Sequence, residues 1–218
     1  MGDLVSRAEA DDLLSRSETL VLQELMNIAF GSASGELEEV LKIYVELKVP
    51  QVDVVPVGHL TDYFGGAAEL GGSTTVVEQQ FWGVFAGTGF LVLPRESGRV
   101  LLAVLEGYDG ERFADRSDDV LEQGAILEVG NILTGACIGR IAELLDTVVT
   151  YTPPQVRLGD ALSEDLRHLE ERSEIAIILK TYFHFTEQGV DGFIFIATQE
   201  ESLGWLKKSI AKFADMIG

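Results

Sequence analysis

The feature that most constrains this chain is an internal repeat. An offset of 104 residues (128 − 24) superposes Glu24-Leu25-Met26-Asn27-Ile28 on Glu128-Val129-Gly130-Asn131-Ile132. The same offset superposes Pro50-Gln51-Val52 on Pro154-Gln155-Val156. Four further identities share it: Glu18 with Glu122, Gly31 with Gly135, Gly35 with Gly139 and Leu41 with Leu145. So many matches at one offset indicate a duplicated unit, and the chain must fold as two related halves.

Each half predicts the same order of elements: a long helix, a short strand, a loop, a β-hairpin and a closing helix. In the first half we expect them over residues 17–46, 51–57, 58–72, 74–93 and 96–106, with Ser17 as the first N-cap. In the second half we expect a helix over 117–145, a strand from 155, a loop over 159–172, a hairpin over 174–198 and a helix over 201–217. Residues 108–110 predict the linker turn.

The repeat also predicts the fold class. The most economical arrangement is one α/β (α+β) domain whose repeats span about 15–107 and about 117–217. Each repeat would contribute three strands to a shared sheet, flanked by the long helices and related by a pseudo-two-fold axis.

The chemistry of the repeat lies in its Glu-x-x-Asn motif. Glu24 and Asn27 are three positions apart, so on a helix they project from one face, one turn apart, and Glu128 and Asn131 repeat the arrangement. A carboxylate accepts from Lys or Arg, whereas a carboxamide both donates and accepts. The pair therefore suits docking followed by orientation of a water molecule, as in phosphoryl hydrolysis. A single such pair on a solvated helix face would be uninformative, and its retention in both halves is what favours function.

The small residues near the motif have a structural interpretation. Gly31 to Gly35 and Gly135 to Gly139 are spaced for close helix packing. Cys137, the one cysteine, excludes an intramolecular disulfide and favours a buried structural thiol in a reducing cytoplasm.

Charge and composition exclude several functions. A formal net charge of −20 opposes binding to nucleic acid and to anionic membranes. The apolar runs are too short for a membrane span. His59, His168 and His184 lack metal-ligand spacing, so we expect no metal site. Ala33 stands where a Gly-x-Ser-x-Gly elbow needs serine.

The spacing from motif to proline resembles a known family. Asn27 to Pro50 and Asn131 to Pro154 each enclose 22 residues (50 − 27 − 1 and 154 − 131 − 1). Two units of Glu-x-x-Asn-x(22)-Pro resemble the CheC family of chemotaxis phosphatases, which is related to CheX and FliY. The resemblance covers nearly the whole chain, and two intact pairs are most like CheC itself.

The resemblance implies a hydrolase that removes phosphate from the aspartyl phosphate of a CheY-like response regulator in two-component chemotaxis signalling. It implies that Asn27 and Asn131 orient water and that Glu24 and Glu128 bind a lysine of the receiver. It also implies that the receiver brings its own Mg²⁺, so no cofactor is expected in this chain.

One departure and two alternatives accompany the resemblance. The family commonly has Asp or Ser four residues before the Glu, where this chain has Leu20 and Gly124. A non-catalytic adaptor that binds a receiver or a CheD-type receptor deamidase is the first alternative. A phosphatase for a receiver outside chemotaxis is the second.

Overall fold

The computed structural model describes residues 13–42, 44–48, 50–56, 74–105, 119–158, 175–199 and 202–217. The predicted loops over 58–72 and 159–172 and the predicted linker at 108–110 lie outside these residues. The junction predicted between the two repeats lies outside them as well.

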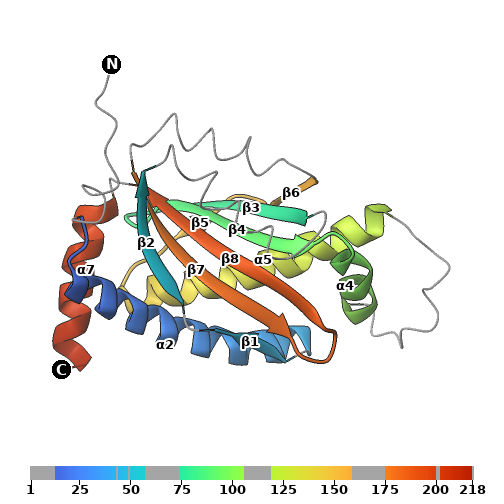
Figure 1. The fold of residues 1–218 in the computed structure, drawn as a ribbon, viewed down its shortest axis with the longest axis horizontal. Helices are drawn as coiled ribbons and strands as arrows, with labels where there is room; N and C mark the ends of the chain where they lie inside the picture. Colours follow the sequence, from blue (N-terminus) through green and yellow to red (C-terminus); the bar gives the residue numbers. More distant parts are fainter. Residues whose placement is uncertain are drawn as a thin grey trace, which may run out of the picture.

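A sheet built from both halves forms the centre of the fold (Figure 1). Its eight strands are β1 (Val45–Leu47), β2 (Gln51–Pro56), β3 (Thr74–Trp82), β4 (Gly87–Pro94), β5 (Thr150–Tyr151), β6 (Gln155–Leu158), β7 (Ile175–Phe185) and β8 (Val190–Gln199). Their order is β1-β7-β8-β4-β3-β5, with β2 also paired to β7 and β6 to β3, and every pairing is antiparallel. Runs of β-branched and aromatic residues account for the long strands.

The two halves exchange their short strands. In the first half, β1 and β2 pair with β7, placing Val52 opposite Leu179. In the second, β5 and β6 pair with β3, placing Val156 opposite Val77. The strand order is therefore unchanged when the halves are exchanged, as a pseudo-two-fold axis between β4 and β8 requires. The prediction of three strands per half was wrong: the described residues contain four in each, because β1 and β5 are too short to leave a sequence pattern.

Helices cover one face of this sheet. α2 (Arg16–Leu41) and α5 (Asp119–Leu144) lie together beneath it, with α7 (Leu203–Ile217) and α4 (Ser97–Leu105) toward opposite ends (Figure 1). The main hydrophobic core joins buried side chains of α2, α5 and α7 to one face of the strands. A smaller cluster, including Phe90 and Phe193, is buried on the other face. By length and composition α5 would pass as a membrane span, but many of its side chains are buried in this core, as in the central helix of a water-soluble fold.

The ends of α2 differ from the prediction. Its N-cap is Ser15 rather than Ser17: Ser15 Oγ accepts from the Glu18 backbone N–H at 3.2 Å, and the Ser15 N–H donates to the Glu18 carboxylate at 2.8 Å. These reciprocal bonds form a capping box. At the other end Lys42 adopts φ 55°, a left-handed conformation that ends the helix after Leu41 instead of near residue 46.

Cys137 confirms its structural interpretation. Its side chain is fully buried in the main core, and this burial raises the pKa of the thiol to about 12. The thiol therefore stays protonated at neutral pH and is not a nucleophile in the folded protein.

Candidate functional site

The structure places both Glu-x-x-Asn motifs on the solvent faces of helices. Glu24 and Asn27 are exposed on α2, and Glu128 and Asn131 are exposed on α5. The residues between them point the other way: Leu25, Met26, Val129 and Gly130 are all buried. Each motif is thus presented outward by a helix whose opposite side is fixed in the core.

The positions four residues before each glutamate are also at the surface. Leu20 is 57% exposed on α2, in line with Glu24 and with Ile28, which is 41% exposed. Gly124 on α5 is exposed, and a Cβ added to it would meet nothing within 4 Å. The first motif therefore has exposed apolar side chains beside it. At the position of Leu20 the second motif has Gly124, which exposes only backbone.

The prediction that the paired glycines serve close helix packing was wrong for three of the four. A Cβ added to Gly31, Gly35 or Gly135 would meet nothing within 4 Å, and at Gly139 it would only reach the Tyr151 hydroxyl at 3.6 Å. Glycine inside a helix costs roughly 1 kcal/mol relative to alanine. No packing contact offsets this cost. The effect of Gly31 and Gly135 is that no side chain protrudes from the helix surface one turn beyond each asparagine.

Asn131 is anchored from below by a buried glutamine of β3. Gln79, 3% exposed, donates through Nε2 to Asn131 Oδ1 at 2.8 Å and to the Thr152 carbonyl oxygen at 3.0 Å. The Thr152 carbonyl oxygen can only accept a hydrogen bond, so the amino group of Gln79 must face it. The atom of Asn131 that bonds to this amino group must also be an acceptor, which is Oδ1. The Asn131 amino group is therefore turned away from Gln79.

Asn27 has no such anchor among the residues that the structure describes. The strand registers place Thr181 where Gln79 stands in the other half, since Lys180 pairs with Gln51 as Glu78 pairs with Gln155. Thr181 Oγ1 donates to the Lys48 carbonyl oxygen at 2.7 Å, which reproduces the bond from Gln79 to Thr152.

Within the part of the chain that the structure describes, no hydrogen bond or ion pair engages the side chains of Glu24, Asn27 or Glu128. The two motifs match in sequence but differ in their surroundings.

A glycine next to Asn131 brings α5 close to the sheet. A Cβ added to Gly130 would lie 2.9–3.0 Å from three atoms of Val77 on β3. The corresponding residue of the other half is Met26, whose large side chain is fully buried. The sequence predicted neither this contact nor the role of Gln79. The one available signal was that Gln79 alternates onto the same face of β3 as the apolar Val77 and Phe81.

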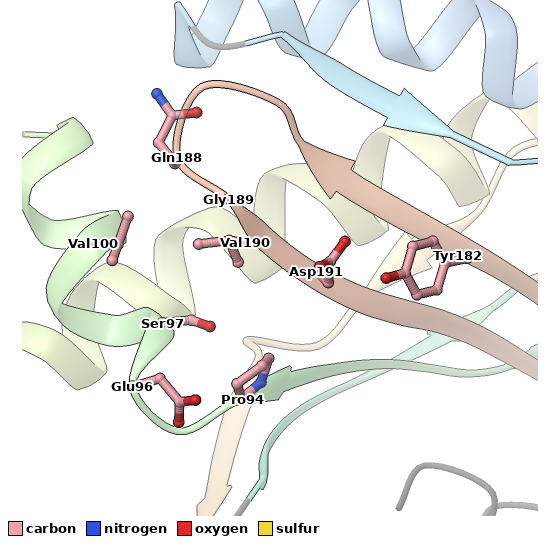
Figure 2. A pocket seen from close by; sticks show the side chains of 9 residues that line it. All are labelled: Pro94, Glu96, Ser97, Val100, Tyr182, Gln188, Gly189, Val190 and Asp191. Atoms are coloured by element: carbon pink, nitrogen blue, oxygen red, sulfur yellow. The ribbon is translucent and has the colours of Figure 1, made fainter. Parts of the chain in front are cut away.

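A separate pocket of about 240 Å³ lies between the turn of the β7–β8 hairpin and the start of α4 (Figure 2). It is lined by Pro94, Glu96, Ser97, Val100, Tyr182, Gln188, Gly189, Val190 and Asp191. Burial, with Asp191 adding to it, raises the pKa of Tyr182 to about 12, so this phenol is no base at neutral pH. None of the motif residues lines the pocket, and it belongs to no site that the sequence predicts. Among the described residues, no three His, Cys, Asp or Glu side chains group as metal ligands would.

Comparisons with known proteins agree with this arrangement. No family model matches the chain. It is 26% identical over 164 residues to the CheY-P phosphatase CheC of Bacillus subtilis (strain 168), over 74% of this chain and 77% of that protein. It is 27% identical over 156 residues to the flagellar motor switch phosphatase FliY of the same organism, over 72% of this chain but 39% of FliY. The solved structure of Thermotoga maritima FliY has a TM-score of 0.66 at 18% identity, covering 92% of this chain and 98% of that one.

The fold defines a class of α/β proteins in which an antiparallel sheet is covered by long helices, and the solved FliY structure shares this fold. Within that class, the chain is similar in sequence to the CheC-family phosphatases CheC and FliY, and it shares the fold of FliY. The resemblance to the CheC family that the sequence suggested is thereby confirmed.

Proposed function

We propose that this protein is a phosphatase that hydrolyses the aspartyl phosphate of a CheY-like response regulator in chemotaxis signalling. The observation that carries the proposal is the presentation of two Glu/Asn pairs on solvent faces of core-anchored helices. The names of the relatives CheC and FliY, both phosphatases, support the same reaction.

The two residues of each pair have different roles. Glu24 and Glu128 are exposed and unpaired among the described residues, so each carboxylate is available to a lysine of the receiver. Asn27 and Asn131, one turn further along, orient a water molecule toward the phosphorus atom. The water attacks in line, the bond between phosphorus and the aspartyl oxygen breaks, and inorganic phosphate leaves. Positioning supplies most of the acceleration in such a reaction.

The surface around each pair supports close approach by a partner. Gly31 and Gly135 leave open space beside the two asparagines. Leu20 and Ile28 expose apolar surface beside Glu24, which a docked protein would bury. The active site forms only when the two proteins meet, so the motif residues need no pocket of their own. Neither the pocket beside α4 nor a second one beside Gly35, both lined by described residues, contains a motif residue.

The metal for the reaction belongs to the partner in this proposal. Mg²⁺ would be bound by the receiver and would neutralise charge on its phosphoryl group, so this chain needs no cofactor of its own. We also place the protein in the cytoplasm, for which the free, buried thiol of Cys137 is suited.

A second candidate is an adaptor that binds a receiver, or a CheD-type deamidase, without hydrolysis. A patch of exposed apolar side chains outside both motifs favours it. Trp82 and Val84 at the β3–β4 turn are 48% and 59% exposed, and Val148 is 82% exposed. Val148 lies beside this turn, because a Cβ on Gly83 would approach its carbonyl oxygen to 2.6 Å.

Steady-state kinetics on a phosphorylated receiver with Mg²⁺ separates the roles. We expect the double variant Asn27→Ala/Asn131→Ala to lower kcat on the order of a hundredfold, about 2.7 kcal/mol of barrier, with KM unchanged. The variant Glu24→Ala/Glu128→Ala should chiefly raise KM, since it removes docking contacts. Wild-type protein that binds the receiver without shortening the lifetime of its phosphate would support the adaptor and exclude the enzyme.

A further inference from the structure

The two Glu-x-x-Asn sites differ in a way that bears on how each would work. Gln79 Nε2 donates to Asn131 Oδ1 at 2.8 Å. The equivalent strand residue of the other half is Thr181, whose hydroxyl donates to the Lys48 carbonyl oxygen at 2.7 Å instead. Asn27 has no side-chain partner among the described residues. An unanchored surface side chain samples several rotamers, so ordering it in a transition state slows the reaction by a factor of roughly two to ten.

Burying the Gln79 side chain carries an energetic cost. Its Oε1 is buried without a hydrogen-bond partner in the described part of the chain. Burying an unsatisfied amide oxygen is unfavourable, and Thr181 meets the demand of the equivalent backbone carbonyl without such a cost. What the longer glutamine adds is its bond to Asn131.

The neighbouring glycine makes this bond possible. Gly130 lets α5 approach β3 until its backbone nearly touches Val77, and this close approach brings Asn131 within reach of Gln79. Met26 stands at the corresponding place on α2. The halves therefore differ at two positions, Gly130 and Gln79, and both differences favour the hydrogen bond from Gln79 to Asn131.

We propose that Gln79 is a positioning residue for Asn131, and that the Glu128–Asn131 site is the preorganised one of the two. The proposal rests on the proposed function. Gln79 binds the amide oxygen and so turns the Asn131 amino group outward, where its N–H groups can donate to the oxygen of the attacking water. The Glu24–Asn27 site must instead order its asparagine when the receiver docks.

The test isolates each site before perturbing Gln79. Gln79→Met keeps the side-chain length and removes both donors. In the Asn27→Ala background, where only the second site remains, we expect kcat to fall roughly fivefold with KM unchanged. In the Asn131→Ala background the same substitution should leave kcat unchanged. Thr181→Val is the matched control, because it removes the equivalent bond to a backbone carbonyl and should leave kcat unchanged in both backgrounds.

Two kinetic results would overturn the proposal. Equal losses from Gln79→Met in both backgrounds would mean that Gln79 only supports the fold. No loss in the Asn27→Ala background would mean that its bond to Asn131 is irrelevant to the reaction.

Side-chain ¹⁵N relaxation in the free protein tests the anchoring itself. We expect the Asn131 amide group to be markedly more ordered than that of Asn27, and the difference to disappear in Gln79→Met. Equal mobility in the wild type would refute the anchoring without any variant. An ordered Asn131 in a protein that leaves phosphorylated receiver untouched would instead refute the phosphatase function and, with it, the catalytic role of Gln79, while leaving the contact itself established.

Discussion

Replacing Gly130 with alanine should destabilise the protein, whereas the same replacement at Gly31 should stabilise it. The new Cβ at Gly130 would lie 2.9–3.0 Å from Val77, closer than atoms in ordinary contact. Val77 is 1% exposed and sits between Leu91 and Val156 in the sheet, so it has little room to move. Overpacking of this kind costs about 1–3 kcal/mol, and the gain in helix propensity returns only about 1 kcal/mol. We expect a net loss of about 1 kcal/mol.

Gly31→Ala is the matched comparison, because its Cβ would meet nothing within 4 Å and it receives the propensity gain alone. The two variants should therefore differ by about 2 kcal/mol in the free energy of unfolding. For a chain of this size, that difference corresponds to roughly 4–8 °C in Tm. Urea unfolding with unchanged m-values, together with calorimetry, measures it. A Gly130→Ala variant as stable as Gly31→Ala would refute the close approach of α5 to β3.

Three further predictions concern stability and reactivity. Ser15→Ala removes the N-cap of α2 and should cost about 1 kcal/mol in urea unfolding, and a loss below 0.2 kcal/mol would argue against the capping box. Hydrogen bonds from Ser15, with Lys207 nearby, lower the pKa of Glu18, so its contribution is present above the unfolded pKa of about 4.3 and is lost as pH falls through the lower folded value. Glu18→Gln should therefore be less stable than wild type by about 0.3–1 kcal/mol at pH 7, and the difference should disappear as pH falls below the folded pKa of Glu18. Cys137 should react with a thiol reagent at pH 8 only at the rate of unfolding, and rapid labelling of the native protein would contradict its burial.

The fold was predictable where one residue type or one spacing determines local structure. The repeat predicted a sheet shared by two halves, and the β-branched runs of β3, β4, β7 and β8 predicted both hairpins. The helical spacing of Glu24 and Asn27 placed them on one face, which the structure bears out as the solvent face. The capping-box spacing from Ser15 to Glu18 was also present in the sequence, and the choice of Ser17 overlooked it.

Features that depend on contacts distant in sequence were not predictable. β1 and β5 are defined by their pairing with β7 and β3, because two or three residues carry no periodicity of their own. Glycine spacing could not reveal which face of a helix meets the sheet. Gly31 is therefore open although its spacing suggested packing, while Gly130 makes the close contact. The bond from Gln79 to Asn131 joins residues 52 positions apart, and only the tertiary fold brings them together.

Phosphate release from an excess of phosphorylated receiver tests the proposed catalysis most directly. A substoichiometric amount of the wild-type protein is added with Mg²⁺ present, and inorganic phosphate is followed over time. We expect many turnovers per molecule and on the order of a hundredfold slower release with Asn27→Ala/Asn131→Ala, confirmed as folded by its unfolding transition. Release at the spontaneous rate with the wild type, or equal release with the folded double variant, would contradict catalysis by the paired asparagines.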